Sequence, residues 1–533
     1  MSDRALAEGV GIAAAPAAPP PAAPAAGLAE VALLASVFVV AACGLVYELV
    51  AGTLASYLLG DSILQFSTVI GTYLFAMGVG SWLSRYLDRQ LVAHFLRIEL
   101  LVGLVGGLMP AALFALQSLA APSFRFALYA LVLAVGILVG LEIPLVMRIL
   151  RRSVRGAHGG LKTLVSQVLT FDYLGALAVS IAFPLLLVPQ LGLIRTGALF
   201  GLMNAAVAVW ALWLFRAELR NMAAHAAAAL ATALVLLATF VAADHVTTWA
   251  EDRFYADHVV YSETSAYQRV VVTSSRAGVR LFLNGNLQFH SRDEYRYHEA
   301  LVHPALSASG APRRVLVLGG GDGMAVREVL KHPSVERVTL VELDPHMTTL
   351  FATAPLLRAL NGDSLHSPKV QIVNADAFAW LEQHDGEMFD AIVVDFPDPT
   401  NFSIGKLYTL SFYQLLERHL SASGHAVVQT TSPLIARKSF WTVATTIEAA
   451  GLTATPYHAH VPSFGEWGFI VAGHRPYRAP SSLPAGLRFL TVAGLPALFE
   501  FPPDMARVPA DVNRLSNQVL VQTFEDEWGK VLR

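Results

Sequence analysis

Seven long apolar segments follow one another in the first half of the chain, and they constrain its fold more than any other feature. Each has roughly the twenty residues that a helix needs to cross a bilayer. A soluble protein buries some apolar helices, but it does not present seven in succession. The sequence therefore predicts an α-helical multi-pass membrane domain over residues 28–245, with helices near 31–53, 63–84, 97–118, 124–148, 168–189, 194–215 and 223–243.

The overall composition agrees with a membrane protein, since 55% of the residues are hydrophobic and only 14% are charged. The net charge of −3 gives no reason to expect a nucleic-acid partner. Cys43 is the single cysteine, which excludes an internal disulfide and a thiolate metal cluster. Residues 1–27 are rich in Ala and Pro and lack the basic start of a signal peptide, so we expect a disordered tail.

Three acidic residues, Glu48, Glu142 and Asp172, lie in or beside the apolar segments. A carboxyl group within a bilayer is costly, and it often marks a transport or ligand path. The alternative is that these residues lie near helix ends, or that they pair with Arg148 or Arg152. The helical half is then either a transport path or only an anchor.

The charge density becomes ordinary after Asp244, and this change predicts the start of a soluble half. We expect a small antiparallel β domain over residues 246–311, with strands at 270–273 and 279–283. Asn284-Gly285 is a strong signal for a two-residue hairpin turn. Two further parts are expected, a Rossmann-like catalytic domain over 312–478 and a C-terminal accessory tail over 479–533.

A glycine-rich stretch organises the Rossmann-like domain. Residues 315–318 are typical of a buried strand, Gly319-Gly-Gly-Asp-Gly323 predicts a tight turn, and 324–331 has the spacing of an amphipathic helix. A second strand, 337–344, ends in acidic residues about twenty positions beyond the glycines, where such folds bind ribose hydroxyls. The stretch is therefore expected to bind a nucleoside.

Asp322 lies inside the glycine loop and indicates which kind of nucleoside. A carboxylate there would repel the phosphates that such loops usually bind, and it would attract a cation. A sulfonium nucleoside fits this loop, whereas NAD and ATP do not. The alternative is that Asp322 only caps the following helix.

Four successive predicted strands are each followed by or end in an acidic residue. The strand and helix pattern predicts a doubly wound parallel sheet, in which the carboxyl ends of the strands line one crevice. A crevice rich in carboxylates and poor in Lys and Arg suits a polycationic substrate. The residues that we expect to converge are Asp322, Glu342, Asp376, Asp395 and Asp398.

A bound metal ion is the competing interpretation of clustered acidic residues. Magnesium usually binds together with substrate phosphates, against which Asp322 argues. The histidines show no spacing of the kind that zinc sites use. We therefore expect no metal site.

Residues 259–475 resemble the spermidine synthases, which are polyamine aminopropyltransferases, and the helical half resembles only the membrane-anchored members of that family. The order and spacing of the shared motifs are specific, unlike a lone glycine-rich loop. The motifs are Tyr267-Gln268, Leu283-Asn-Gly-Asn-Leu-Gln288, Asp293-Glu-Tyr-Arg-Tyr-His-Glu299, Gly319-Gly-Gly-Asp-Gly323, Val341-Glu-Leu-Asp344, Asp376-Ala377 and Asp395-Phe-Pro-Asp-Pro399.

The resemblance implies a Rossmann-like fold of the S-adenosylmethionine methyltransferase type and a transfer reaction. The aminopropyl group of decarboxylated S-adenosylmethionine would pass to putrescine, giving spermidine and methylthioadenosine. That donor is a co-substrate, so no separate cofactor is expected, and the partners would be a small diamine, the lipid bilayer and further copies of the chain. The nucleoside part would be held by Gln268, Glu342, Asp376, Ala377, Gly319 and Gly321.

The resemblance also assigns the amine side of the site. Asp322 would bind the aminopropyl ammonium group, and Tyr297, His298 and Asp398 would hold the diamine. Asp395 would be the general base that leaves the attacking amine neutral, because an ammonium group has no lone pair.

Three departures from the family pattern all fall on the acceptor side. The hairpin has Asn284-Gly285 where the family usually has Asp-Gly. The segment after Asp398-Pro399 runs Thr400-Asn-Phe-Ser-Ile-Gly405 where Gly-Pro-Ala is usual. Val461 replaces the usual tyrosine before Pro462. The nucleoside site is therefore more firmly indicated than the identity of the amine.

Two other functions fit parts of the sequence. An S-adenosylmethionine-dependent amine methyltransferase would share the sheet, but it would favour a proline-tyrosine motif where this chain has Asp395-Phe-Pro-Asp398. A membrane polyamine transporter or sensor with an inactive spermidine-synthase-like domain is the second alternative, and the complete set of acidic residues argues against it.

Two arguments give opposite answers about which side of the membrane the catalytic domain faces. Basic residues gather in alternate loops, around Arg85–Arg97, Arg148–Lys162 and Arg216–Arg220, while the opposite loops contain only Arg125 and Arg195. The positive-inside rule then places the soluble half outside after seven crossings. Its donor, however, is made from a cytoplasmic metabolite. We expect an inner-membrane protein with a cytoplasmic catalytic domain, which requires that residues 223–243 lie along the surface or re-enter.

Overall fold

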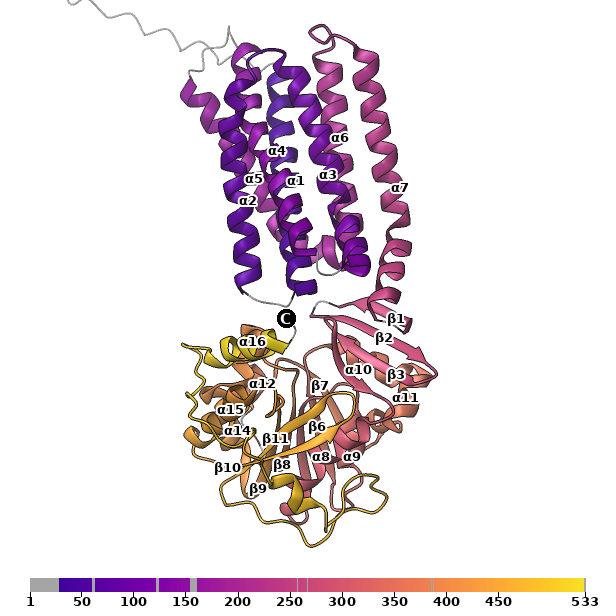
Figure 1. Ribbon diagram of the computed structural model, residues 1–533, viewed down its shortest axis with the longest axis vertical. Helices are drawn as coiled ribbons and strands as arrows, with labels where there is room; N and C mark the ends of the chain where they lie inside the picture. The colour runs from indigo at the N-terminus through magenta and orange to yellow at the C-terminus, as the bar shows by residue number, and fades with distance from the viewer. Residues whose placement is uncertain are drawn as a thin grey trace, which may run out of the picture.

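The computed structural model describes residues 28–59, 63–120, 124–153, 161–255, 257–265, 267–384, 386 and 388–531. A bundle of long helices stands above an α/β domain, and the two halves follow one another along the long axis of the molecule (Figure 1). The tail expected over residues 1–27 lies outside the described residues.

The described part of the first half folds into seven α-helices, in the order and near the positions expected from the apolar segments. Six helical stretches are long and apolar enough to cross a membrane by length and composition. The helices are α1 Leu28–Leu59, α2 Ile63–Leu83, α3 Leu91–Ala120, α4 Phe124–Ser153, α5 Leu161–Ala182, α6 Val188–Leu214 and α7 Met222–Phe254, with a short 3₁₀ turn at Ser84–Tyr86.

One of the six stretches, Lys162–Leu214, contains two helices, because its 53 residues would make a helix far longer than a bilayer is thick. The chain turns between α5 and α6 through a π-helical segment, Phe183–Leu187, and Gly192, whose φ of 71° is left-handed. The Thr196 hydroxyl group donates to the carbonyl group of Leu187 at 3.4 Å, which a straight helix would not allow.

Glycines allow the helices of the bundle to pack closely. A Cβ atom on Gly103 would lie 2.8 Å from the carbonyl oxygen of Gly201, and one on Gly140 would lie 2.2 Å from that of Met77. Gly136 and Gly80 make similar approaches between α2 and α4, as their spacing predicts. Gly78, by contrast, has nothing within 4 Å of its Cβ position.

The last helix, α7, packs along α6 and α3 and leads into the first strand of the α/β half (Figure 1). Arg195 near the start of α6 pairs with Asp244 near the end of α7 at 2.7 Å, so the two helices are antiparallel over most of their length. Residues 223–243 form part of one continuous helix packed along α6 and α3, which favours a crossing over a re-entrant or surface segment. The helix also continues to Phe254, beyond the change of composition at Asp244.

The pairing of Glu142 with Arg148 or Arg152 is also wrong. Arg148 donates to the carbonyl oxygen of Ser84 at 2.6 Å and lies 3.6 Å from Asp88, while Arg152 donates to the carbonyl oxygen of Asp88. These contacts join the end of α4 to the α2–α3 loop at the end of the bundle remote from the α/β domain (Figure 1).

The small β domain is a four-stranded antiparallel sheet in sequence order. Its turn at Asn284-Gly285 has φ angles of 49° and 82°, which confirms the expected hairpin because both residue types tolerate this conformation. The Asn284 side chain also accepts a hydrogen bond from the Arg269 N–H group at 3.0 Å. The strands are β1 His258–Thr264, β2 Arg269–Ser275, β3 Gly278–Leu283 and β4 Asn286–His290.

The main sheet has seven strands in the order β10-β11-β9-β8-β5-β6-β7. Pairing is parallel from β9 through β7, but β11 is antiparallel to both of its neighbours. The expected methyltransferase-type sheet is thus present, and the expectation of a wholly parallel sheet is wrong at β11. The strands are β5 Arg314–Gly319, β6 Arg337–Glu342, β7 Val370–Asn374, β8 Phe389–Asp395, β9 Leu420–Thr430, β10 Thr453–Val461 and β11 Gly465–Gly473.

Helices cover both faces of this sheet, which explains the unbroken apolar runs of its central strands. On β5, Val315 and Val317 face one core and Leu316 and Leu318 face the other, and all four are buried. The helices are α8 Glu294–Ala308, α9 Met324–Val329, α10 Pro345–Thr353, α11 Pro355–Asn361, α12 Ala377–Gln383, α13 Phe402–Gly405, α14 Leu410–His419, α15 Arg437–Ala449 and α16 Val519–Val531, with 3₁₀ turns at Ser364–His366, Lys406–Tyr408 and Leu495–Phe499.

Candidate active site

The two central strands β5 and β8 end side by side at the glycine loop. Gly319 and Asp395 are register partners, and a Cβ atom on Gly319 would lie 2.3 Å from the carbonyl oxygen of Asp395. Gly319 also has a left-handed φ of 76°. Glycine is required at this position for both reasons, and its absence of a side chain brings Asp395 against the loop.

Gly321 and Glu342 meet at the side of the crevice that we predict to bind the nucleoside. The Gly321 N–H group donates to Glu342 Oε2 at 3.1 Å, and the Asp344 N–H group donates to Glu342 Oε1 at 2.9 Å. A Cβ atom on Gly321 would lie 2.7 Å from Glu342 Cγ. Burial raises the pKa of Glu342 to about 7, although these two hydrogen bonds oppose the rise.

Gln268 reaches the same edge of the crevice from the small β domain. Its Nε2 donates to Asp344 Oδ2 at 3.1 Å, and the same oxygen accepts from Ser265 Oγ at 2.7 Å. Asp344 also caps α10 through the N–H group of His346. These bonds hold the loop of the small domain beside the end of β6.

Asp376 and Ala377 lie at the start of α12, after β7. Asp376 Oδ1 accepts from the N–H groups of Phe378 and Ala379, and its Oδ2 accepts from Lys406 Nζ at 2.5 Å. Burial opposes a fall in the pKa of Asp376, but the Lys406 hydrogen bond and charge lower it overall. The expectation that the carboxylates lack a lysine partner is therefore wrong at Asp376.

Asp322 occupies the glycine loop and has a local hydrogen bond as well as a free oxygen. Its Oδ1 accepts from the Met324 N–H group at 2.9 Å, which satisfies the start of α9. Among the described residues, the side-chain hydrogen bond of Asp322 is made at Oδ1 and none is made at Oδ2. Burial raises the pKa of Asp322. The capping role is thus present, and one oxygen stays available for a ligand.

Asp395 lies at the carboxyl end of β8 and contacts Tyr297 on α8. The phenol of Tyr297 donates to Asp395 Oδ1 at 2.6 Å. Burial raises the pKa of Asp395 to about 6, and the charge of Asp322 contributes to the rise, while the charge of His298 and the Tyr297 hydrogen bond oppose it. A carboxylate with this pKa is ionised at neutral pH and basic enough to accept a proton.

Asp398 follows three residues later with a buried oxygen that has no partner. Its Oδ1 has no hydrogen bond from the described residues, and burial raises its pKa to about 7. The preceding backbone is fixed by Tyr408, which donates to the carbonyl oxygen of Pro397 at 3.1 Å, and by Gln429, which donates to that of Phe396. An incoming cation would supply the missing partner of Asp398.

His298 does not offer a free acceptor to an ammonium group. Its Nδ1 lies 2.8 Å from Glu294 Oε2, and Arg327 binds the same carboxylate at 2.8 Å. Burial lowers the pKa of His298, but the hydrogen bond and charge of Glu294 raise it overall to about 9. A cationic imidazole beside Asp322 and Asp395 stabilises their ionised forms.

Sequence reasoning missed several side chains that position the site. Glu294, Arg327 and Lys406 come from separate elements, and a charged residue on a helix more often faces solvent than a buried partner. Asp293 and Glu299 belong to the same shared motif as Glu294 but hold other loops, since they accept from the N–H groups of Ser463 and Arg488.

The C-terminal tail packs against the segment that departs from the family pattern. A Cβ atom on Gly405 would lie 2.4 Å from Val521 of α16, and the Asn513 side chain donates to the carbonyl oxygen of Tyr408 at 3.0 Å. Trp528 also donates to Thr431 Oγ1 at 3.0 Å. The tail therefore supports the segment that follows Asp398-Pro399.

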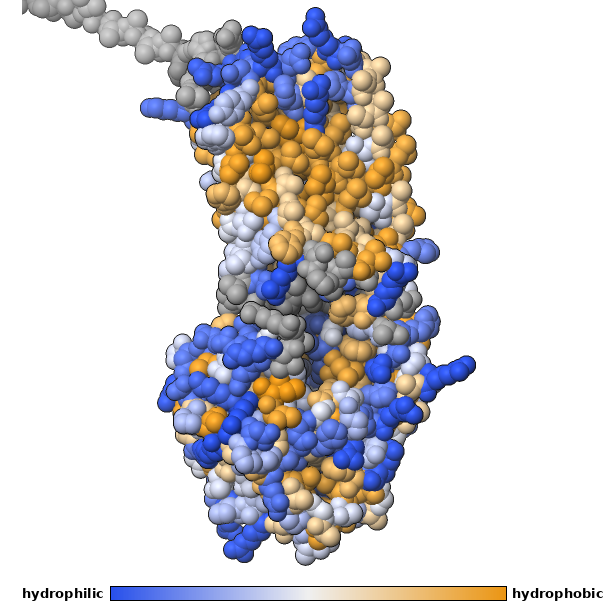
Figure 2. Space-filling view, viewed as in Figure 1, coloured by the Kyte–Doolittle hydropathy of each residue, from blue (hydrophilic) through white to orange (hydrophobic). Residues whose placement is uncertain are grey.

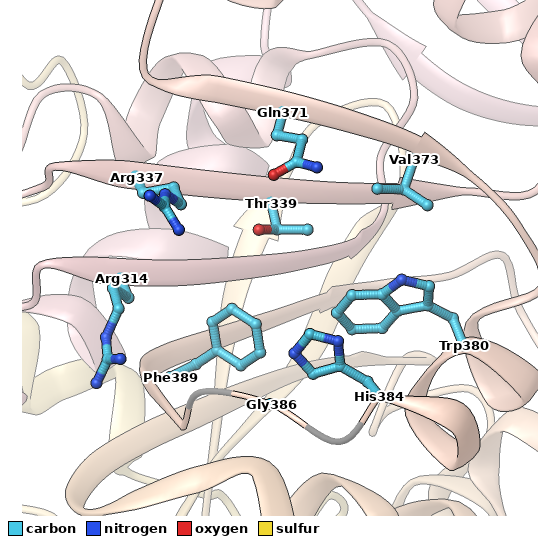
Figure 3. A pocket seen from close by; sticks show the side chains of 9 residues that line it. All are labelled: Arg314, Arg337, Thr339, Gln371, Val373, Trp380, His384, Gly386 and Phe389. Atoms are coloured by element: carbon cyan, nitrogen blue, oxygen red, sulfur yellow. The ribbon is translucent and has the colours of Figure 1, made fainter.

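A cavity of 310 Å³ lies elsewhere on the sheet (Figure 3). Its lining includes Arg314, Arg337 and Phe389, which are the first residues of β5, β6 and β8. The candidate site lies at the opposite, carboxyl ends of these strands, so the cavity is separate from it.

The comparison with known proteins agrees with the geometry of the crevice. Residues 294–478 match the spermine/spermidine synthase domain family. The chain is 56% identical to polyamine aminopropyltransferase 2 of Ralstonia nicotianae, over 94% of this chain and 99% of that protein. It is equally similar to polyamine aminopropyltransferase 1 of the same organism, over 94% of this chain and 96% of that protein.

A more distant relative gives the same result. The chain is 49% identical to the polyamine aminopropyltransferase of Leptospira interrogans, over 94% of this chain and all of that protein. These alignments extend across the helical bundle as well as the α/β domain, and they confirm the family expected from the motifs. The chain belongs to the spermidine synthase family of polyamine aminopropyltransferases.

Proposed function

We propose that this chain transfers the aminopropyl group of decarboxylated S-adenosylmethionine to putrescine, giving spermidine and methylthioadenosine. The observation that carries the proposal is the convergence of Asp322, Asp395 and Asp398 on one crevice beside a nucleoside-type glycine loop. Two of these carboxylates have oxygens without a donor among the described residues, as a site for ammonium groups requires.

Asp395 is the general base in this proposal. The amine nitrogen attacks the carbon bonded to the sulfonium, a C–N bond forms, and the C–S electron pair goes to sulfur. The nitrogen must lose a proton, which Asp395 accepts, and Tyr297 holds the acceptor carboxylate in place. A base of this kind contributes roughly 10²–10⁴-fold, and alignment of the two ligands supplies much of the rest.

The nucleoside part of the donor lies against the ends of β6 and β7 in this arrangement. Glu342 is already oriented by the N–H groups of Gly321 and Asp344, and its carboxylate can accept hydrogen bonds from ribose hydroxyl groups. Gln268 closes this edge from the small domain, and Asp376 with Ala377 borders the base. Gly319 and Gly321 leave room for the sulfonium chain.

The two ends of the amine substrates have separate partners. Asp322 Oδ2 takes the ammonium group of the aminopropyl chain, and Asp398 takes the distal ammonium group of putrescine. Tyr297 borders the attacking nitrogen through its bond to Asp395. His298 acts through the carboxylates, because its own charge would repel an ammonium group.

The helical bundle crosses a lipid bilayer in our proposal. The face of the bundle seen in Figure 2 carries an apolar band between hydrophilic ends, and Phe75, Phe126 and Val241 of the bundle helices expose their side chains. Trp82 and Trp213 are exposed near the ends of α2 and α6, where aromatic side chains favour the interface with the headgroups. Membrane attachment would keep the enzyme beside the bilayer.

We further propose that the catalytic half faces the cytoplasm of an inner-membrane protein and that the chain assembles as a homo-oligomer. Supply of the donor supports the first point, and the second follows from the resemblance described in the sequence analysis. The loop charges argue against the first, since the basic loops lie at the end of the bundle remote from the catalytic half.

Product analysis with the purified full-length chain tests the reaction. Decarboxylated S-adenosylmethionine and putrescine should give spermidine and methylthioadenosine in equal amounts by mass spectrometry. Methylated putrescine formed from S-adenosylmethionine, with no product from the decarboxylated donor, would instead identify an amine methyltransferase.

A further inference from the structure

The helical bundle encloses two glutamates that the proposed reaction does not use. Glu99 lies on α3 and Glu142 on α4, and their exposures are 0% and 1%. Only Glu142 stands out in the sequence, because Glu99 lies near the start of an apolar segment, where a solvated helix end is the simpler interpretation. Both side chains point into the bundle.

Neither carboxyl group has a hydrogen-bond partner among the residues that the structure describes. All four oxygens of Glu99 and Glu142 are buried and unpaired. The Tyr47 hydroxyl group on α1 and both polar atoms of the Asn204 amide on α6 are also buried and unpaired. Tyr47 and Asn204 are completely buried, so solvent does not satisfy them. Polar groups in this state are rare in proteins, and each calls for an explanation.

These side chains gather in one place. Glu142 lies within electrostatic range of Glu99, and Tyr47 lies within range of both. The Asn204 Cβ atom lies 3.1 Å from the Cβ position of Gly103, one helical turn beyond Glu99. Four helices, α1, α3, α4 and α6, thus contribute to one buried polar cluster inside the bundle.

The chemistry of the cluster indicates a cationic organic ligand. It presents carboxylate, amide and phenol oxygens, and no ion pair to either glutamate occurs within the described part of the chain; the nearby Arg148 pairs with Asp88 instead. No set of three or more metal-ligating side chains occurs there either. An alkylammonium group supplies several N–H donors, its methylene chain suits apolar walls, and the Tyr47 ring can face its charge.

We propose that Glu99, Glu142, Tyr47 and Asn204 form a second binding site, inside the bundle, for a linear aliphatic diamine. The choice of this amine class rests on the proposed function, because the catalytic half uses such an amine. The two carboxylates neutralise the two ammonium groups of one putrescine molecule. The bundle is then a ligand-binding part of the protein in addition to its attachment to the bilayer.

Equilibrium binding of radiolabelled putrescine to the full chain in lipid nanodiscs tests the site. The Asp395→Asn/Asp398→Asn variant removes the acceptor carboxylates of the catalytic half and leaves the bundle unchanged. This variant should still bind about one putrescine per chain. Because the bundle of this variant is unchanged, absence of binding would overturn the proposal.

Adding Glu99→Gln and Glu142→Gln to that variant should lower the affinity for putrescine by 10-fold or more. Glu48→Gln is the matched control, because Glu48 lies on α1 beside Tyr47 but outside the cluster, and it should leave binding unchanged. Retained binding in the Glu99→Gln/Glu142→Gln background, or equal competition by sodium at the same concentration, would contradict the assignment.

Turnover separates this proposal from the proposed function. Glu99→Gln/Glu142→Gln with an intact catalytic half should produce spermidine at the wild-type rate, which also shows that the chain is folded. Loss of turnover in that variant, with normal gel filtration, would contradict a site separate from catalysis. A wild-type chain that binds putrescine in the bundle but makes no spermidine would refute the proposed function alone.

Discussion

Tyr297 donates a 2.6 Å hydrogen bond to Asp395, and this bond joins the first turn of α8 to the end of β8 across 98 residues of sequence. The proposed base is therefore held by a side chain from another element instead of by its own loop. The same carboxylate lies within range of a cationic His298 and of a second acidic residue, Asp322. The properties of the base are set by all three neighbours.

Replacing Tyr297 by Phe should move the acidic limb of the rate profile to higher pH. The reaction needs ionised Asp395, so kcat/KM should fall as the pH drops through about 6 in the wild type. The Tyr297 hydrogen bond lowers the pKa of Asp395, and its loss raises that pKa. The measurement is kcat/KM between pH 5 and pH 9, and His298→Gln should shift the limb in the same direction. An unchanged limb in both variants would mean that another group sets it.

Asp322→Asn should weaken the binding of decarboxylated S-adenosylmethionine far more than that of methylthioadenosine. Only the donor has an ammonium group, and a hydrogen bond to a charged group contributes about 1.5–3 kcal/mol. Asparagine can still accept from the Met324 N–H group, so the start of α9 should be preserved. Calorimetry with both ligands measures the difference. Equal losses would reduce Asp322 to a helix cap.

Gly321→Ala should raise the KM for the donor. The new Cβ atom would lie 2.7 Å from Glu342 Cγ and would displace the carboxylate that we assign to the ribose. Gly529→Ala in α16 is the matched control, since nothing lies within 4 Å of its Cβ position. Steady-state kinetics on both variants measure the KM for the donor. Similar KM values for the two would remove Glu342 from the nucleoside site.

A reporter fused after Arg533 should fluoresce if the catalytic half faces the cytoplasm. The structure makes this test sharper, because residues 223–243 belong to the continuous helix α7, which packs along α6 and α3. A phosphatase that is active only after export should be inactive at the same position. The reverse pair of results would place the domain outside, as the basic loops indicate.

Local patterns predicted much of this site, and long-range contacts account for what they did not predict. Short motifs with specific backbone conformations predicted three features: the glycine loop, the hairpin at Asn284-Gly285 and the acidic residues after the strands. The Lys406 bond to Asp376 joins positions 30 residues apart, and no local spacing encodes it. The antiparallel direction of β11 depends on how the edge of the sheet is completed.

The bundle shows the same division between local and long-range information. Apolar length was enough to predict its helices, because a helix satisfies its own backbone groups. The turn at Gly192 falls in the gap between the two predicted segments 168–189 and 194–215. The meeting of Glu99 with Glu142 depends on helix packing, and the sequence places them 43 positions apart.

The Asp395→Asn variant tests the central claim most directly, because it removes the base and keeps the shape of the side chain. Turnover with decarboxylated S-adenosylmethionine and putrescine should fall on the order of 10²-fold or more. The affinity for methylthioadenosine, measured by calorimetry on the same preparation, should stay nearly unchanged. Near-normal turnover in this variant would contradict the assignment of Asp395 as the base and the mechanism built on it.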